Sequence, residues 1–564
     1  MPSYPDLPNV DLLDRIPLDA QVVLDVGCGT ASLGAAYRRC NPRAILLGID
    51  RDAEAAAIAA ERLDQVANVD VEANPLPFEL SGGIDCIIYG DVLEHLRDPW
   101  TLLRCHMAAL ADNGTVLICI PNVEHWSFAA RLLRGTWEYE PSGLLDETHL
   151  RWFSLESMRR TLVATGLTLC DVHPRVFDQE QARGFVTAIT PALRAMGADP
   201  QEYLTRAAPL QYVWRARRQA QPRLTIASSM LEPVGGVSHV RVVYPLRAMA
   251  TDPSVATHLV TPPEMPATEP DAPRICILHR AALAGVRGVE MLQRLFAEGW
   301  VVVTEFDDHP DYFRVMQGSE HLTFRGVHAV QTSTPALAGV LLTRNPEVMV
   351  FPNAIRVLPE PRNFTDPNGM TLFFGALNRE ADWEPLMPTL NSVAAAVGDR
   401  LRFQVVHDNA FFAALQTPHK RFTPTCDHDT YMTLLGQSEI ALMPLSDTPF
   451  NRTKSDLKFI EAAACRVASL ASPVVYADSI EDGRTGLLFN DPGQLRDRLL
   501  RLLSMPGLAL AIGEAARDYV SDERMLAYQV APRIAWYRSL WARRAELTAA
   551  IQARLAPAPA GNRP

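Results

Sequence analysis

The stretch VVLDVGCGTASLG, from Val22 to Gly34, decides the fold of the first part of the chain. An apolar run that suits a buried parallel strand ends at Asp25, and a turn containing Gly27 and Gly29 leads into a helix-forming run. Glycines here allow a sharp turn and a close approach of the backbone to a ligand. The stretch therefore predicts the opening strand, turn and helix of a ligand-binding α/β domain.

Two details of this stretch argue against a nicotinamide dinucleotide as the ligand. The glycine spacing is G-x-G-x-x-x-x-G, and Ser32 stands where the dinucleotide fingerprint has its third glycine. An acid, Asp25, precedes the turn, which suits a cationic ligand better than a pyrophosphate. A sulfonium nucleoside with an amino-acid tail has that character.

Length and composition bound the class of protein. A chain of 564 residues predicts two or three domains, and 48% hydrophobic with 21% charged residues is typical of a soluble globular protein. The net charge of −12 argues against nucleic acid as the main partner. Nine cysteines without a C-x-x-C pair indicate a reducing compartment rather than disulfides or a zinc site.

The location of the protein is predicted from its termini and its apolar runs. Residues 1–15 contain no basic, apolar or cleavage region of a secretion signal, and no stretch approaches the ~20 apolar residues of a membrane span. We therefore expect a cytoplasmic protein. Residues 210–219, LQYVWRARRQ, are predicted as a closing edge strand that runs into a basic linker. The basic cluster of this region is either solvated or in peripheral contact with an anionic membrane surface: Arg215, Arg217, Arg218 and Arg223.

Acids follow the next two predicted strands. AILLGID ends at Asp50, 23 residues beyond Gly27, a distance at which an acid accepts hydrogen bonds from ribose hydroxyls. The alternative for Asp50 is a helix N-cap, which Asp52 can supply instead. Residues 68–73, NVDVEA, are predicted as the third strand, with Asp70 or Glu72 placed to meet an adenine amino group.

A fourth strand is predicted from Ile84 to Tyr89, with a helix beginning after Asp98 and a fifth strand around the turn at Gly114. Between strand and helix, polar residues crowd the carboxyl edge of the sheet, where open α/β sheets bind their ligands. These residues are Asp91, Glu94 and His95.

Four motifs in order, LDVGCGTASLG, LLGID, DCIIYGDVLEHLRDP and NGTVLICIPN, resemble a class I S-adenosylmethionine-dependent methyltransferase. The resemblance covers roughly Pro17 to Arg218 and implies a seven-stranded Rossmann-like domain over residues 1–219 with S-adenosyl-L-methionine as cofactor. It further implies a contact with the methionine part by Asp25, Gly27 and Gly29, with the ribose by Asp50, with the adenine by Asp70 and with the sulfonium by Asp91.

The segment of residues 123–154 goes beyond the minimal fold and is where acceptor-binding insertions occur in this class. Its tryptophans either stack on a sugar or pack on one another as a lid: Trp126, Trp137 and Trp152. His149 and His95 are candidates for the general base that removes a hydroxyl proton, because imidazole titrates near neutral pH. Asp146, Glu147 and His149 lack a clean metal-ligand spacing, so we expect no metal.

A second series of strands and helices begins at Leu224, with a glycine turn at Gly235–Gly236 and a helix over residues 237–249. Prolines and glycine in residues 359–369 mark a hinge, and another alternating unit starts at Met370. Two such units resemble a GT-B glycosyltransferase over roughly Pro222 to Leu540. The boundaries predicted are residues 220–362, residues 363–520, a returning helix over 521–545 and a disordered tail over 546–564.

The stretch from Lys454 to Asp491 is similar to the nucleotide-binding region of retaining family-four glycosyltransferases. The resemblance implies that Glu461 grips the ribose of a nucleotide-sugar donor as an essential acid of the site. That family has a second glutamate eight positions earlier, where this chain has Thr453. A hydroxyl cannot supply the missing charge, which leaves the activity of this half open.

Basic residues stand where they can face a diphosphate leaving group. Further donor-binding candidates besides Glu461 are Gly236, Arg379, Lys454 and Lys458. Lys454, Lys458 and Glu461 are predicted to share one face of a helix, for which the alternative is an ordinary solvated face. His279 and Arg280 are expected at the cleft, and Asp307, Asp308 and His309 form either an acidic turn, which we favour, or a metal triad.

Three interpretations of function follow. The first is a bifunctional enzyme that transfers a methyl group and a sugar to a glycan or lipid-linked glycan. The second is a methyltransferase with an inactive glycan-binding half. The third, S-adenosyl-L-methionine as a purely regulatory ligand, is disfavoured by the elaborate segment of residues 123–154.

Overall fold

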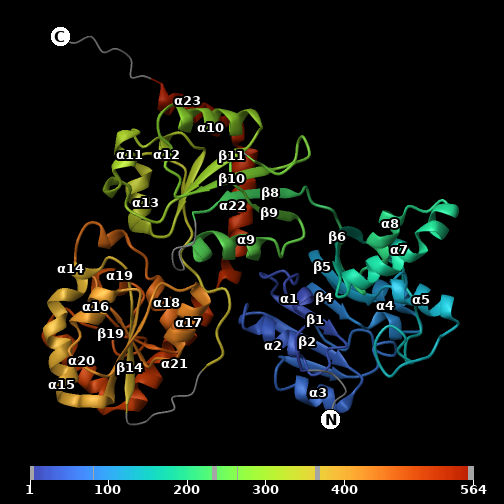
Figure 1. The fold of residues 1–564 in the computed structure, drawn as a ribbon, viewed down its shortest axis with the longest axis horizontal. Coiled ribbons are helices and arrows are strands. Elements are labelled where there is room, and N and C mark those ends of the chain that lie inside the picture. The colour runs from blue at the N-terminus through green and yellow to red at the C-terminus, as the bar shows by residue number, and fades with distance from the viewer. Residues whose placement is uncertain (1–5, 81, 232–237, 263, 362–368, 557–564) are drawn as a thin grey trace. The chain divides into compact units, whose positions relative to one another are not determined.

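A computed structural model describes residues 6–80, 82–231, 238–262, 264–361 and 369–556 (Figure 1). The chain divides into two compact units, one of residues 1–222 with Ala250–Val255, the other of residues 223–249 with 256–564. Both are α/β structures built on mainly parallel sheets, so the predicted fold class is confirmed.

The first unit holds a sheet whose described strands run in the order β3-β2-β1-β4-β5-β7-β6. The parallel strands are β1 (Val22–Val26), β2 (Ile45–Asp50), β3 (Gln65–Asn68), β4 (Ile84–Gly90) and β5 (Leu110–Pro121). Strand β7 (Gln211–Arg217) runs antiparallel to both β5 and β6 (Thr168–Arg175). The carboxyl ends of β2, β1 and β4 consequently lie side by side at one edge.

Helices join these strands, and side chains that accept hydrogen bonds from free amides define where several of them begin. Asp52 caps α3 (Ala53–Ala59), Asp98 caps α4 (Pro99–Ala109), and Ser154 forms a capping box at α6 (Leu155–Ala164). The predicted helix after Asp98 is confirmed. The other helices of this unit are α1 (Val10–Leu13), α2 (Ser32–Arg38), η1 (Leu93–His95), α5 (Trp126–Arg134), α7 (Gln179–Ala195) and α8 (Pro200–Ala207).

Two predictions for this unit are wrong. Strand β3 ends at Asn68, and a turn follows because the Asp70 carboxylate accepts a hydrogen bond from the Glu72 amide at 2.9 Å. Strand β7 is not an edge strand, since it lies between β5 and β6. Of the four arginines predicted in the linker, the two on β7 are not solvated: Arg215 pairs with Asp171 at 2.7 Å, and Arg217 is only 5% exposed. Residues 219–223, with Arg223, are exposed and lie between β7 and β8, as a solvated linker does.

The second unit contains two six-stranded sheets. The first has the order β13-β12-β11-β10-β8-β9 and the second β16-β15-β14-β17-β18-β19. The strands of the first are β8 (Leu224–Ser229), β9 (Val255–Leu259), β10 (Arg274–His279), β11 (Val301–Glu305), β12 (Ala329–Thr332) and β13 (Val348–Val350). Those of the second are β14 (Met370–Gly375), β15 (Leu401–Val406), β16 (Lys420–Thr423), β17 (Ile440–Met443), β18 (Ala468–Ala471) and β19 (Leu487–Leu488).

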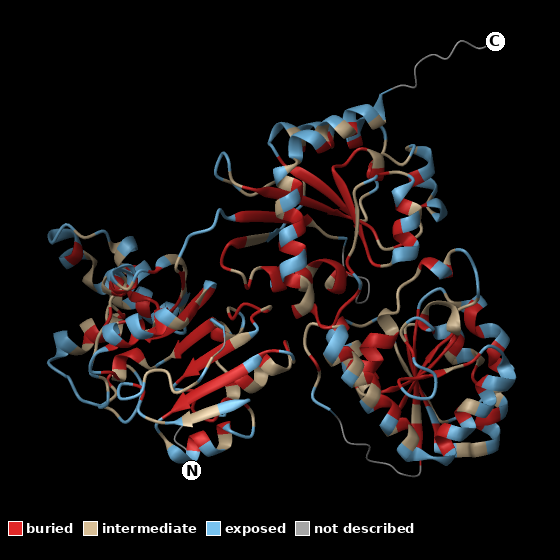
Figure 2. Cartoon of the chain, turned by 180° about the vertical axis from the view of Figure 1, so that it is seen from behind, coloured by how far each residue is buried: buried red, intermediate tan, exposed pale blue. Residues whose placement is uncertain are grey.

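Helices flank both sheets of this unit, with one face of most helices buried and the other exposed (Figure 2). Those around the first sheet are η2 (His239–Val243), α9 (Tyr244–Met249), α10 (Gly285–Ala297), η3 (Pro310–Tyr312), α11 (Arg314–Gly318), α12 (Leu322–Arg325) and α13 (Pro335–Leu342). Those of the second part are α14 (Glu380–Trp383), η4 (Glu384–Leu386), α15 (Met387–Val397), η5 (Gly398–Arg400), α16 (Asn409–Ala414), α17 (His428–Gly436), η6 (Asn451–Thr453), α18 (Leu457–Ala464), α19 (Pro473–Tyr476), α20 (Pro492–Ser504) and α21 (Pro506–Glu523).

After η7 (Leu526–Gln529), helix α22 (Val530–Ala542) returns to the first sheet of this unit, as predicted. The Tyr537 hydroxyl donates a hydrogen bond to Gln331 of β12 at 2.6 Å, and Trp536 packs against Phe351. The prediction of disorder from residue 546 is wrong, because α23 (Arg544–Leu555) continues the chain as a helix and buries Leu547 and Ile551. Residues 557–564 lie outside the described part.

Among the described residues, no single helix is both long and apolar enough to span a bilayer. Helices α20 and α21 meet that requirement only as a pair, and they are bent by 103° where they join.

Gly513 of α21 marks a close approach of this helix to the backbone. A Cβ atom there would lie 2.3 Å from the carbonyl oxygen of Arg466, which is main chain and cannot swing aside. Replacing Gly513 by alanine should therefore cost about 1–3 kcal/mol of stability through overpacking. Calorimetry should show a melting temperature lower by about 2–4 °C for each kcal/mol.

Gly507 provides the matched control on the same helix, because no atom lies within 4 Å of a Cβ built there. Gly507→Ala should leave the melting temperature unchanged or raise it slightly, since alanine is the better helix former. Equal effects of the two substitutions would contradict the close packing of α21.

Candidate functional site

A cavity of about 980 Å³ lies at the edge where β1, β2 and β4 of the first unit end. It is lined by every residue that the resemblance implied for cofactor binding: Asp25, Gly27, Gly29, Asp50, Asp70 and Asp91. The structure therefore brings these six together, as the parallel order of the strands requires.

The turn after β1 shows why glycine is needed there. Gly27 has φ of +71°, and a Cβ at this position would lie 2.5 Å from a methyl group of Val92. The Gly29 amide donates a hydrogen bond to the Asp50 carboxylate at 2.7 Å. This bond ties the glycine turn to the end of β2.

Asp50 and Asp52, at the end of β2, have different hydrogen-bond partners. Asp52 caps α3, accepting from the amides of Glu54 at 2.9 Å and Ala55 at 3.1 Å, so Asp50 is not needed as a helix cap. Asp50 accepts from Gly29 and from the Asp52 amide at 2.8 Å. The Asp50 carboxylate lines the cavity, and its hydrogen bond to Gly29 holds the glycine turn beside it.

Asp25 is 8% exposed, and no hydrogen bond from a described residue to its carboxylate is present. Burial, together with the negative charge of Asp50, raises the pKa of Asp25 to about 7. A cation at this place would restore the ionised form, since an opposite charge within a few ångströms lowers a carboxyl pKa.

Asp70 and Glu72 both line the cavity, but Glu72 is engaged elsewhere. One of its carboxylate oxygens accepts from the amides of Arg97 at 3.0 Å and Asp98 at 2.9 Å. Of the two adenine-side candidates, Asp70 is therefore the one with more capacity to accept from a ligand.

Asp91 begins the loop after β4 in a left-handed conformation, with φ of +56°. Enclosure by the cavity wall raises the pKa of Asp91 to about 6, against the lowering effect of Arg175. Gln211 donates a hydrogen bond to Asp91, and Arg175 donates one to Gln211. Arg175 itself is anchored by Asp11 at 2.7 Å.

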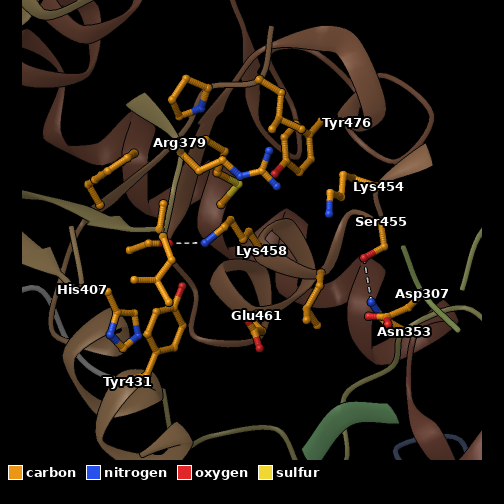
Figure 3. Close-up of a pocket in the computed structure, with 18 of the residues that line it drawn as sticks. Asp307, Asn353, Arg379, His407, Tyr431, Lys454, Ser455, Lys458, Glu461 and Tyr476 are labelled. Atoms are coloured by element: carbon orange, nitrogen blue, oxygen red, sulfur yellow. Dashed lines mark hydrogen bonds between the residues drawn. The ribbon is translucent and has the colours of Figure 1, made fainter. Parts of the chain in front are cut away.

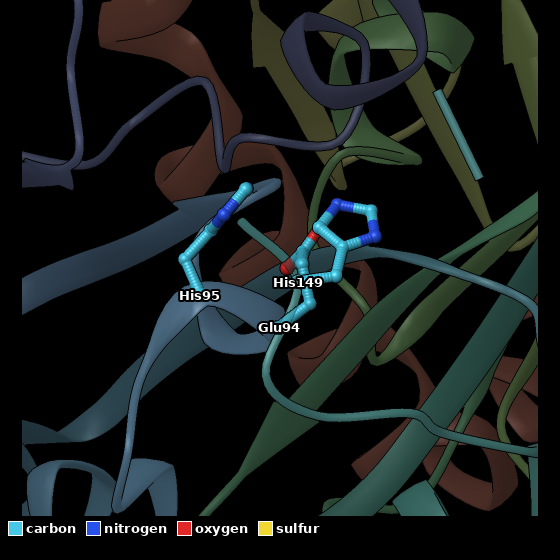
Figure 4. A group of neighbouring side chains, drawn as sticks. All are labelled: Glu94, His95 and His149. Carbon is cyan, nitrogen blue, oxygen red and sulfur yellow. The ribbon is translucent and has the colours of Figure 1, made fainter. Parts of the chain in front are cut away.

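Glu94, His95 and His149 form a cluster at the same cavity (Figure 4). One ligand-type atom of each residue lies within 4.8 Å of those of the other two. Burial raises the pKa of Glu94 well above its usual range, with Asp91 adding to the effect. Burial lowers the pKa of both histidines, so both are neutral at physiological pH.

The tryptophans of residues 123–154 pack on other aromatic rings and are not part of the cavity wall. Trp137 and Trp152 lie 6.3 Å apart between ring centres, and both contact Phe128. Trp126 packs on Phe185 at 5.9 Å. Trp137 and Trp152 thus match the alternative in which the segment packs on itself, whereas Trp126 packs on α7.

A second cavity, of about 260 Å³, lies in the second unit and is lined from both of its sheets (Figure 3). Three of the predicted cations line it, namely Arg379, Lys454 and Lys458, together with Glu461. Gly236 lies outside the described residues.

The predicted helix face is wrong in one respect, because α18 begins only at Leu457. Lys454 precedes the helix, directly after the short turn η6, and pairs with Asp308. Lys458 lies on the helix and donates to the backbone carbonyl of Gly375. Burial lowers the pKa of Lys458 to about 8.

Glu461 is 4% exposed and accepts a hydrogen bond from His428 at 2.9 Å. Burial by itself lowers the pKa of His428, but the bond to Glu461 outweighs it, so the pKa is raised. The Tyr244 hydroxyl lies 2.9 Å from the other ring nitrogen of His428. Glu461 is thus held in place by His428, the first residue of α17.

Thr453 does not replace the missing glutamate. It is buried, its hydroxyl donates to the Phe450 carbonyl at 2.8 Å, and it is not among the residues that line the cavity.

Arg280 and Asp307 line the cavity and pair at 2.6 Å. His279 does not line it, because its side chain is buried beneath the strand end at 2% exposure. His309 caps η3 through its ring nitrogen and does not join Asp307 and Asp308 in a cluster of possible metal ligands.

Several residues at this cavity were not predicted from the sequence. They are Arg241, Asn353, His407, His428, Tyr431, Ser455 and Tyr476. Arg241 forms a fully buried pair with Glu305 at 2.9 Å and donates to the Phe351 carbonyl at 2.7 Å. Asn353 donates to Ser455 at 2.7 Å and so joins the two parts of the unit. The residue types of these seven carry no spacing pattern that would have identified them.

Comparisons with known proteins match part of each unit. A family described as "Methyltransferase domain" matches residues 7–172. Residues of this part are 34% identical over 128 positions to trans-aconitate 2-methyltransferase of Azoarcus sp. (strain BH72), covering 22% of this chain and 49% of that protein. They are 31% identical over 140 positions to ubiquinone biosynthesis O-methyltransferase of Xanthomonas campestris pv. campestris (strain B100), covering 22% and 58%. The chain thus spans about half the length of the curated relatives it matches.

The second unit matches a different family, described as "Glycosyl transferases group 1", over residues 369–505. Among solved structures, sucrose-phosphate synthase from Thermosynechococcus elongatus is similar at 14% identity and a TM-score of 0.42, covering 57% of this chain and 100% of that one. Alr3699/HepE of Anabaena, in complex with UDP-glucose, is similar at 13% identity and a TM-score of 0.43, covering 56% and 100%. The chain thus carries a match to a methyltransferase domain in its first unit, followed by a match to a group 1 glycosyl transferase domain in its second.

Proposed function

We propose that the first unit transfers a methyl group from S-adenosyl-L-methionine to an oxygen atom of a sugar. The observation that carries this is the pair of buried carboxylates at the ends of adjacent strands, Asp25 without a bonded partner and Asp50 facing the cavity. Asp25 with Gly27 and Gly29 binds the methionine part, Asp50 the ribose, Asp70 the adenine, and Asp91 lies beside the sulfonium. His149 and His95 then face the acceptor and make its hydroxyl easier to deprotonate.

We further propose that the second unit transfers a glycosyl group from a nucleotide sugar. Arg379, Lys454 and Lys458 face the diphosphate, while Glu461 holds the ribose. Cations preorganised around a leaving diphosphate stabilise the charge that develops on it. The second candidate function is glycan binding without sugar transfer. It stays open because Thr453, which stands where the family has its second glutamate, turns away from the cavity.

The two activities together suit a cytoplasmic enzyme of polysaccharide or glycoconjugate biosynthesis that modifies a glycan or a lipid-linked glycan. A peripheral membrane contact would have to use a surface other than the paired arginines of β7.

Asp50→Asn should weaken binding of S-adenosylhomocysteine by about 1–3 kcal/mol, because charge-assisted bonds to the ribose are lost while the side chain keeps its shape. Isothermal titration calorimetry on the full chain measures this without an acceptor. Asp52→Asn is the control, since asparagine caps a helix as well as aspartate does. Unchanged affinity in Asp50→Asn would remove Asp50 from the ribose site.

Glu461→Gln should weaken nucleotide binding by about 1.5–3 kcal/mol, the usual worth of a hydrogen bond to a charged group. The measurement is calorimetry with UDP, GDP and ADP, followed by sugar transfer from whichever matching nucleotide sugar binds. Thr453→Ala should cost little, because that side chain does not reach the cavity. Wild-type protein that binds none of the three nucleotides would favour the glycan-binding candidate.

His428 should titrate above the ordinary histidine value of about 6.5. In Glu461→Gln the pKa of His428 should fall, because the hydrogen bond and the charge of Glu461 are lost and burial is then opposed only by Asp429 and Asp427. Histidine-selective NMR follows both midpoints, with His428→Gln assigning the signal. Since the folded state holds this proton more tightly, the pair stabilises the fold below about pH 6.5, and the contribution is lost as the pH rises through the raised pKa. Identical midpoints in both proteins would refute the pairing.

A further inference from the structure

The cluster of Glu94, His95 and His149 is not used by the proposed cofactor contacts. We propose that this cluster binds a divalent transition-metal ion such as zinc, an inference that rests on the proposed methyl transfer. The ion would hold the oxygen atom of the acceptor beside the methyl donor.

The three residues supply a recognised set of ligands at short range. Two imidazoles with one carboxylate bind zinc in catalytic sites that leave a further coordination position open. Their ligand-type atoms all lie within 4.8 Å of one another (Figure 4). Ligand atoms around a tetrahedral zinc ion are roughly 3.5 Å apart at metal distances of about 2.0–2.2 Å. Small side-chain rotations therefore complete the geometry.

The surrounding hydrogen bonds determine which nitrogen of each imidazole carries the hydrogen and which has the lone pair. His149 Nδ1 lies 3.3 Å from the Leu144 carbonyl, which only accepts, so Nδ1 carries the hydrogen. Thr148 donates its hydroxyl hydrogen to Asp146 at 2.6 Å and therefore accepts from His95 Nδ1 at 2.9 Å. In both rings the lone pair is left on Nε2. Such outer hydrogen bonds are typical of histidines that bind metals.

Glu94 supplies a second, independent observation. Its side chain is 2% exposed, and neither carboxylate oxygen has a hydrogen-bond partner among the described residues. A buried carboxylate without a partner is costly, and a cation between it and two imidazoles removes that cost.

The backbone fixes the distance across the cluster. The Glu94 carbonyl accepts from the amides of Leu150 at 2.7 Å and Arg151 at 2.9 Å. The loop that carries His149 is thereby held against the segment that carries Glu94 and His95.

The cluster lines the same cavity as Asp91, so an acceptor oxygen bound to the metal faces the proposed position of the sulfonium. A hydroxyl bound to the metal loses its proton to solvent more readily. Its oxygen then forms a bond to the methyl carbon while the carbon–sulfur bond breaks, and the electron pair of that bond stays on sulfur. The products are the methylated acceptor and S-adenosylhomocysteine.

The test titrates the untagged full chain, stripped with a chelator, with Co²⁺ and follows the visible absorption of the bound ion. One equivalent should bind to the wild type. Glu94→Gln and His149→Ala should each weaken binding at least roughly 100-fold, because even an outer partner of a ligand is worth about 10–100-fold. Glu147→Gln, an exposed acid on the same loop, should bind like the wild type. Circular dichroism confirms that each variant is folded.

No saturable Co²⁺ binding by the wild type overturns the proposal, as does binding that Glu94→Gln leaves unchanged. Loss of binding in Glu147→Gln also overturns it, because the ion would then lie on Asp146, Glu147 and His149. Calorimetry with S-adenosylhomocysteine on the same preparations separates this inference from the proposed function. Cofactor binding without Co²⁺ binding refutes the metal site and leaves the methyltransferase proposal intact.

Discussion

A carboxylate removed from water must be paired with a positive group or give up its charge. In the second unit this constraint is met within the chain, because Glu305 is paired with Arg241 and Glu461 with His428. In the first unit, Asp25 and Glu94 have no such partner among the described residues. This difference distinguishes the two cavities, because the Glu461 that lines the second already has a partner from the chain, whereas Asp25 and Glu94 in the first have none among the described residues.

The two cavities consequently have opposite electrostatic character. Carboxylates gather at the strand ends of the first, which suits the sulfonium and ammonium groups of the proposed cofactor. Arg379, Lys454 and Lys458 line the second, which suits a diphosphate. Burial, to which the charge of Arg379 adds, lowers the pKa of Lys458 to about 8. An anion bound there would favour the protonated form again, so binding of a diphosphate and protonation of this lysine support each other.

Local signals predicted much of this structure. The strand that ends at Asp50 and the helix that begins after Asp98 depend on residues within a few positions of each other. Parallel strands then bring their carboxyl ends to one edge, which is why the acids of the first cavity could be predicted as a group. The interior position of β7 could not, because an antiparallel pairing with β5 depends on residues roughly a hundred positions apart.

The parts of the sites that were missed depend on distant contacts in the same way. His428 contacts Glu461 from another helix. Glu94, which follows the end of a strand, lies close to His149 of a loop that is distant in the sequence. The start of α18 at Leu457 was missed because Lys454, Ser455 and Asp456 are polar, so no apolar pattern marks where the helix begins.

The position of β7 inside the first sheet also sets an order of biosynthesis. Strand β6 reaches the rest of the sheet only through β7, although β7 is made later. During synthesis, β6 therefore cannot pair into the sheet until β7, which ends at Arg217, has emerged from the ribosome. The first unit also includes Ala250–Val255. The first unit is thus completed only when part of the second unit has already been made.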